Sequence, residues 1–187
     1  MRPEKIESLR LQHINDLELL SRSLPTRFAS TLLQLRTHLS LIYNSAYPTV
    51  LTHNDLGEMN ILVDPQTGNI TGIIDWADTK ILPFGVALWG LLNITGWMNQ
   101  TGWHYYPNWR ELEKEFWKVF EELVGGLSEV EKRSIRLSST VGIFMRYGFR
   151  WDERLGRRPV NDSDPSLQYL EAFFGDGETA MDSIILR

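Results

Sequence analysis

Three polar residues in the first half of the chain have the types and the spacing that phosphoryl transfer requires. Asp55 and Asn60 lie in one stretch rich in turn-forming and polar residues, and Asp75 follows further along the chain. A carboxylate and an amide oxygen together make a hard-oxygen site that suits Mg²⁺. In phosphoryl transfer, Mg²⁺ neutralises the phosphate oxygens while a separate Asp takes or orients the proton of the attacking hydroxyl. The set fits this chemistry, with Asp55 as the separate carboxylate.

A β-hairpin is the element that must bring these side chains together. Two short apolar runs, 61–64 and 70–75, flank residues 65–68, whose types (Pro, Gln, Thr, Gly) favour a turn. In an antiparallel hairpin the residue that enters the first strand lies beside the one that leaves the second, with Cβ atoms roughly 5 Å apart. Asn60 and Asp75 should therefore lie side by side, within a residue or two of register. Both runs are apolar at nearly every position, so we expect the hairpin to be buried on both faces.

Each of these residues also has a simpler explanation when it is taken alone. Asp55 and Asp75 can be turn and strand-end residues whose carboxylates cap nearby backbone amides. The joint pattern of the three residues favours the phosphoryl-transfer site.

The rest of the chain is mainly helical, which gives an α+β fold class. Apolar spacing and breaker residues predict helices over 4–22, 28–42, 84–94 and 165–174. Two further helices start at apparent capping boxes, one at Asn108 with Glu111 and one at Ser128 with Glu131. Gly125 and Gly126 end the first of these two helices.

Composition excludes several functional classes. The chain has 187 residues, which predicts one domain, and no cysteine, which excludes disulfides, thiol catalysis and Cys-ligated zinc. A net charge of -5 argues against nucleic-acid binding, and the Arg-rich stretch 150–158, diluted by two acids, is expected to be a solvated loop. No apolar run is long enough to span a membrane, and the N-terminus has no signal-peptide core. We therefore expect a cytoplasmic protein that binds neither membrane nor nucleic acid.

Two motifs carry a resemblance to a known family. The pattern His53-x-Asp55-x4-Asn60 resembles the catalytic loop of kinases, and residues 71–76 (Thr-Gly-Ile-Ile-Asp-Trp) resemble the metal-binding strand of aminoglycoside phosphotransferases. Together the motifs cover residues 51–86. The chain thus resembles the aminoglycoside phosphotransferase and choline kinase-like family, which has a protein-kinase-like fold, and in its motifs it is closest to fungal members.

The resemblance implies a role for each motif residue. Asp55 is the catalytic residue, Asn60 and Asp75 bind Mg²⁺, and His53 supports the loop structurally. Asp78 is a further candidate for the rim of the site, with a solvated turn residue as the alternative. The resemblance also implies ATP as the phosphoryl donor and a small-molecule hydroxyl as the acceptor.

The chain departs from the family pattern in two places. Members usually carry an Asp a few residues after the equivalent of Pro83 that tethers the catalytic loop; here the stretch 84–88 has no acid, so backbone groups or Asn54 must replace it. The residues before His53 read as helical and contain neither a glycine-rich strand nor a strand lysine.

These departures predict that the ATP-binding N-lobe is not present. We expect a single domain over 1–187 that corresponds to the C-terminal catalytic lobe, with leading helices at 1–50, the catalytic loop and metal-binding hairpin at 51–80, and a helical subdomain at 81–187. The chain would be a shortened kinase whose activity alone is in question, or a partner chain would supply the other lobe. The alternative is a non-catalytic kinase-like binding or interaction protein. Apolar surface left uncovered would favour a partner chain or self-association.

An aromatic segment follows the hairpin. Residues 95–107 are expected to form a loop rich in Gly, Trp and Tyr, and Trp97, Trp103 and Tyr105 are candidates for an acceptor pocket near Asp55. Aromatic rings give flat apolar walls whose faces attract cations. The alternative is that these rings pack in the core.

Overall fold

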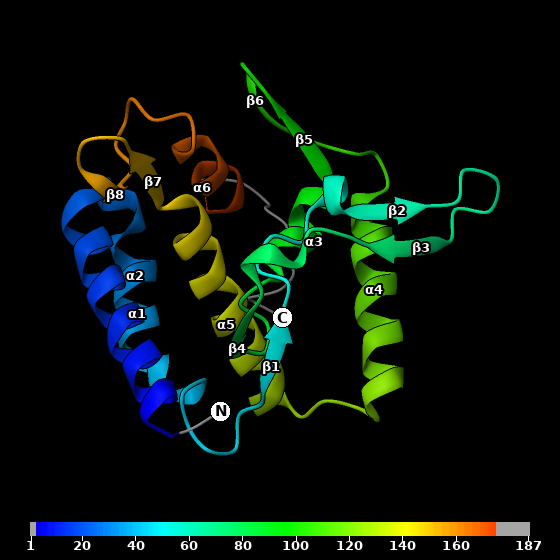
Figure 1. Ribbon diagram of the computed structural model, residues 1–187, viewed down its shortest axis with the longest axis horizontal. Coiled ribbons are helices and arrows are strands. Elements are labelled where there is room, and N and C mark those ends of the chain that lie inside the picture. The colour runs from blue at the N-terminus through cyan, green and yellow to red at the C-terminus, as the bar shows by residue number, and fades with distance from the viewer. Residues whose placement is uncertain (1–2, 175–187) are drawn as a thin grey trace.

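Three long helices form the layer that contains the core. The structure is a computed structural model that describes residues 3–174, and in it α1 (Pro3–Ser23), α2 (Ala29–His38) and α5 (Glu129–Tyr147) lie side by side, while α6 (Leu167–Phe174) covers one end (Figure 1). Leu17 and Leu20 of α1 and Phe144 of α5 are completely buried between them. Burying one such side chain contributes about 1.5–3 kcal/mol. The predicted mainly helical class is confirmed.

The first two predicted helices are present, the second in a broken form. The segment 28–42 is α2 with one 3₁₀ turn on each side, η1 (Thr26–Phe28) and η2 (Leu39–Leu41). The apolar positions that predicted this helix, among them Leu32 and Leu35, are buried as expected.

Within residues 3–174 the strands form four two-stranded antiparallel sheets. The pairs are β1 (Thr49–Thr52) with β4 (Lys80–Pro83), β2 (Ile61–Val63) with β3 (Ile70–Ile73), β5 (Gly96–Asn99) with β6 (Gly102–Tyr105), and β7 (Phe149–Asp152) with β8 (Gly156–Pro159). The short η3 (Glu58–Asn60) and η4 (Trp76–Asp78), α3 (Trp89–Ile94) and α4 (Trp109–Val124) complete the chain. The sequence predicted only the β2–β3 pair.

The expectation that the β2–β3 hairpin is buried is wrong. The hairpin projects away from the helical layer (Figure 1), and its apolar side chains are open to solvent, with Val63 53% and Ile70 64% exposed. Its strands are apolar on both faces, as the sequence showed, but no element of residues 3–174 covers them. An apolar run shows which side chains of a strand could be buried, but it does not show whether another element packs against them.

The stretch 84–107 also differs from the prediction. Of the helix predicted over 84–94, only Trp89–Ile94 is helical, and residues 84–88 form successive turns. The loop predicted over 95–107 contains the β5–β6 hairpin. Gly102 at its tight turn has φ 125°, a conformation that glycine adopts without strain. The aromatic residues in 96–105 favour strands, but the glycines and polar residues among them suggested a loop.

The two predicted capping boxes have opposite outcomes. At α5, Glu131 N donates to Ser128 Oγ and Ser128 N donates to the Glu131 carboxylate at 2.8 Å, which confirms that box. At α4, Asn108 makes no side-chain cap bond, so that box is wrong although the helix begins where predicted. Gly125 ends α4 with φ 82°, as expected.

The Arg-rich stretch is a structured hairpin and not a solvated loop. β7 and β8 carry Arg150 and Arg158, and both guanidinium groups bind the buried carboxylate of Asp164. The backbone N–H of Asn161 donates to the same carboxylate at 2.9 Å. This network lies just before α6, which begins at Leu167 and not at the predicted Pro165. Among residues 3–174 no helix is long and apolar enough to cross a membrane.

Gly142 on α5 generates a stability prediction. A Cβ at this position would lie 1.8 Å from the carbonyl oxygen of Val86, so Gly142→Ala must push the 84–88 turns away from α5. We expect the free energy of unfolding to fall by about 1–3 kcal/mol, as overpacking does, although alanine favours a helix over glycine. Urea denaturation measures the change. Arg133→Ala on an exposed position of the same helix is the control, and a stabilised Gly142→Ala protein would contradict the close approach.

Asp164 generates a prediction about pH. Burial raises the pKa of this carboxyl. Hydrogen bonds from Arg158 and Arg150 lower it by more than burial raises it, so the pKa is about 2 instead of 3.8. A lowered pKa contributes stability above about pH 4 that is lost as the pH falls towards 2. We expect Asp164→Asn to be about 1–3 kcal/mol less stable at pH 7 and to lose less stability than the wild type between pH 4 and 2.

Urea denaturation at several pH values between 2 and 7 tests the role of Asp164. Asp162→Asn removes a nearby exposed carboxylate and is the matched control. Equal pH dependence in the wild type and in Asp164→Asn would show that the network does not depend on the charge of Asp164.

Candidate active site

Two antiparallel ladders place the two predicted site segments opposite each other. β1 ends directly before residues 53–60, here called the catalytic loop, and β2 begins directly after it. Their partners, β4 and β3, flank residues 74–79, here called the metal segment. Loop and segment therefore start and end at paired strands, which fixes them relative to each other.

Ile74 in the metal segment is hydrogen-bonded to both ends of the catalytic loop. Its backbone N–H donates to the carbonyl oxygen of Asn60 at 3.0 Å, and its carbonyl oxygen accepts from Nε2 of His53 at 2.7 Å. A carbonyl oxygen only accepts, so the imidazole carries its proton on Nε2. The His53 ring is buried and packs edge-on against Trp76, with 4.7 Å between ring centroids. His53 thus lies where it holds the loop to the segment.

The structure brings Asn60 and the backbone of Asp75 together. The bond from Ile74 N to the Asn60 carbonyl places Asp75 one residue beyond a direct backbone contact with Asn60. The Asn60 amide nitrogen donates to the carbonyl oxygen of Asp55 at 2.8 Å, so its Oδ1 is not used in that bond. Asn60 therefore joins Asp55 and the metal segment within one hydrogen-bonded unit.

Asp75 has an unusual backbone conformation. Among residues 3–174 it is the one non-glycine residue with positive φ, at φ 59° and ψ 58°. Asp and Asn adopt the left-handed region more readily than other non-glycine residues, and such positions occur in turns and at functional sites. Its carboxylate has no hydrogen-bond or ion-pair partner in the described part of the chain.

An Asn oxygen and a free carboxylate fit Mg²⁺, which takes one or two protein ligands and completes its shell with water or phosphate oxygens. Residues 3–174 contain no group of three or more His, Cys, Asp or Glu side chains that could hold a metal alone. The donor set of Asn60 and Asp75 therefore suits a metal that arrives with phosphates more than a permanently bound one.

Asp55 is paired with an arginine that the sequence did not reveal. Nη2 of Arg146, near the end of α5, lies 2.7 Å from Oδ1 of Asp55, and both side chains are nearly half exposed. The guanidinium carbon of Arg146 lies 4.5 Å from the centre of the Trp89 ring. Arg146 belongs to no local motif, and only the packing of α5 against α3 brings it to the loop.

Asn54 provides a tether where the family acid after Pro83 is missing. Its amide nitrogen donates to Oδ2 of Asp78 at 2.6 Å, and Lys80 lies 2.9 Å from the other oxygen of that carboxylate. The hydrogen bond from Lys80 is the main cause that lowers the pKa of Asp78; burial opposes it and Asn54 adds to it. Asp78 is exposed and links the catalytic loop to the metal segment.

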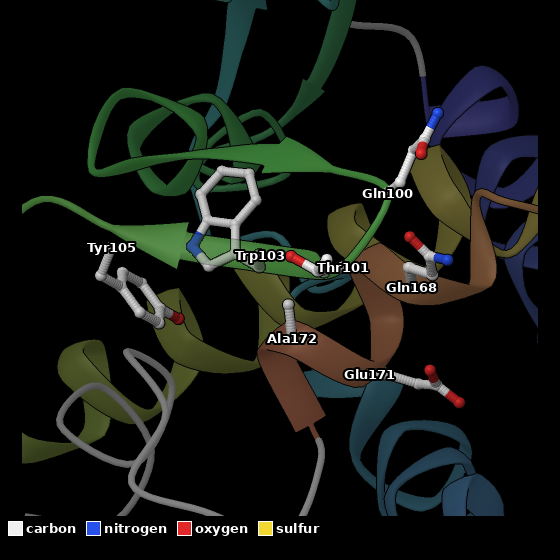
Figure 2. Close-up of a pocket in the computed structure, with 8 residues that line it drawn as sticks. Gln100, Thr101, Trp103, Tyr105, Gln168, Glu171 and Ala172 are labelled. Atoms are coloured by element: carbon white, nitrogen blue, oxygen red, sulfur yellow. The ribbon is translucent and has the colours of Figure 1, made fainter.

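The three aromatic candidates do not converge on one place. In the β5–β6 register Trp97 lies opposite His104 and stacks on it, whereas Trp103 and Tyr105 point to the other face. Trp103 and Tyr105 line a pocket of about 310 Å³ between the hairpin and α6 (Figure 2). Trp103 also packs against Tyr169 and Phe173 of α6, so its ring continues the core.

This pocket lies some way from the catalytic loop. Gly90, in the first turn of α3, contacts the backbone of Leu56 in the loop, whereas β5 begins only after the opposite end of α3. The six residues of α3 rise about 9 Å along the helix axis.

The comparisons with known proteins give one match. A family model described as phosphotransferase enzyme family (APH) matches residues 5–117, which is more than half of the chain. No curated protein and no solved structure matches the chain.

The pair of Asn60 and Asp75 generates a prediction about metal binding. Mn²⁺, which resembles Mg²⁺ in its ligand preference and broadens nearby NMR signals, should broaden the side-chain amide of Asn60 and the backbone amide of Asp75. Asp75→Asn should remove this broadening because it removes the charged ligand. Asp162→Asn, which removes a remote exposed carboxylate, should retain it. Broadening centred elsewhere, or unchanged in Asp75→Asn, would show that the two side chains do not share a cation.

Proposed function

The chain belongs to the phosphotransferase enzyme family, and from this premise we propose that it transfers a phosphoryl group from ATP to a hydroxyl of a small molecule with the help of Mg²⁺. The observation that carries the proposal is the hydrogen-bonded unit of Asp55, Asn60 and Ile74, which holds the backbone of Asp55 and of the residue before Asp75 next to Asn60. Such a unit suits a reaction in which the protein mainly positions the reactants and stabilises charge.

Each residue of the unit has a separate task in the proposed reaction. Asn60 and Asp75 would hold Mg²⁺, which neutralises charge on the phosphates when it is bound. Asp55 accepts a hydrogen bond from the acceptor hydroxyl and directs its oxygen towards the phosphoryl group. His53 keeps the loop in register through Ile74 and does not contact the reactants.

The nucleotide is expected to bind weakly to this lobe alone. The catalytic loop and metal segment offer a place for Mg²⁺ and the phosphates, whereas the sequence shows no glycine-rich strand or strand lysine to grip them. Apolar side chains around the loop, such as Leu51, Met59 and Ile81, are exposed. Association over this surface with a partner chain or a second copy stays a prediction, as does the cytoplasmic location.

A non-catalytic binding protein is the second candidate, and the same exposed apolar side chains favour it. This candidate requires no role for the free Asp75 carboxylate or for its left-handed backbone. The two functions separate in one pair of measurements, the effect of nucleotide on thermal stability and the formation of ADP.

Nucleotide binding should depend on Mg²⁺. With a dissociation constant of about 1 mM, 10 mM ATP stabilises the protein by about 1.4 kcal/mol, which raises Tm by roughly 3–6 °C for a chain of this size. Without Mg²⁺, and in Asp75→Asn, the shift should disappear. A binding protein without nucleotide function shows no shift in any of these samples.

Catalysis should depend on Asp55. In an ADP-release assay with a panel of small hydroxyl compounds, Asp55→Asn should lower kcat at least about 100-fold, as expected when a general base is removed. The Mg²⁺-dependent Tm shift with ATP should remain, because Asp55 is assigned to the hydroxyl and not to the metal. An active Asp55→Asn variant would disprove this role.

A further inference from the structure

Arg146 reaches the Asp55 carboxylate from the C-terminal end of α5. Its Nη2 lies 2.7 Å from Oδ1 of Asp55, and its guanidinium lies over the ring of Trp89, which is buried. On the same turn of α5, Tyr147 is buried and its hydroxyl donates to Oδ1 of Asn93 in α3 at 2.8 Å. Arg146 therefore stands on a helix end that is itself fixed to α3.

We propose that Arg146 is the positioning residue of Asp55: it binds one carboxylate oxygen so that the other faces the acceptor hydroxyl. This inference rests on the proposed function, in which Asp55 orients that hydroxyl. Because Oδ1 is taken by Arg146, Oδ2 is left to accept from the acceptor. A planar guanidinium that stacks on an indole ring has one preferred orientation, which an ammonium group lacks.

The backbone of the loop is held by the residue next to Trp89. A Cβ on Gly90 would lie 2.0 Å from the carbonyl oxygen of Leu56, so the loop backbone lies directly on α3 at this point. Neighbouring residues of α3 thus support both the carboxylate, through Arg146, and the backbone one residue after Asp55. The first turn of α3 therefore helps to position Asp55.

The ion pair between Arg146 and Asp55 contributes little to the stability of the fold. Both side chains are more than 40% exposed, and exposed ion pairs contribute about 0–1 kcal/mol to folding. In phosphoryl transfer the catalytic-loop carboxylate orients the acceptor hydroxyl and accepts its proton. A cation that fixes the Asp55 carboxylate therefore assists the reaction through geometry.

The test compares Arg146→Gln, Arg146→Lys and the control Arg133→Gln, which removes an exposed arginine from the same helix. Three-bond NMR couplings report the χ1 rotamer of Asp55 in the chain without nucleotide. We expect one rotamer in the wild type and in Arg133→Gln, and averaging in Arg146→Gln. Arg146→Lys keeps the charge but not the planar stack and should be intermediate. Unfolding in urea should be the same for all four proteins within about 1 kcal/mol.

Kinetics supply the second readout. Arg146→Gln should lower kcat between about 10-fold and 100-fold, the effect of a misplaced catalytic group, while KM for Mg²⁺-bound ATP stays within about twofold. An unchanged rotamer or an unchanged kcat in Arg146→Gln would overturn the proposal, as would an equal loss in Arg133→Gln. If the wild type transfers no phosphoryl group, the proposed function fails, and the NMR couplings still decide whether Arg146 orders Asp55.

Discussion

The candidate site depends on the two hydrogen bonds of Ile74. Its N–H is bound to the end of the catalytic loop at Asn60 and its carbonyl to the start of the loop at His53. Asp75, the next residue, has a left-handed backbone conformation. Its carboxylate has no hydrogen-bond or ion-pair partner in the described part of the chain. A buried, protonated Nε2 of His53 is the element that closes this arrangement.

The local part of the site could be predicted from the sequence, because short-range rules determine it. The turn chemistry of residues 65–68 sets the hairpin, and the hairpin sets the proximity of Asn60 and Asp75. Arg146 could not be predicted in the same way. Its contact with Asp55 depends on how α5 crosses α3, and no spacing rule relates residues that meet only through the packing of two helices.

The errors in the fold have a common origin. Apolar patterns show which residues can be buried, but burial also needs a neighbouring element. The β2–β3 hairpin has the composition of a buried strand pair and still exposes Val63 and Ile70. In the opposite sense, the Arg-rich stretch has the composition of a solvated loop, yet Asp164 behind it gives Arg150 and Arg158 a buried partner. One acid outside the stretch changes its structure, and a charge count within the stretch cannot show this.

The helical layer connects the core to the chemistry. α5 is completely buried at Val141 and Phe144, and its end carries the exposed Arg146. Gly142, between those buried positions, brings the 84–88 turns onto α5, and these turns lead directly into α3, where Trp89 and Gly90 meet Arg146 and the loop. If Arg146 orients Asp55 as proposed, that orientation depends on the close packing of α5 against α3 more than on the strength of the ion pair itself. A weak, half-exposed contact can hold a catalytic group when both of its supports belong to a packed core.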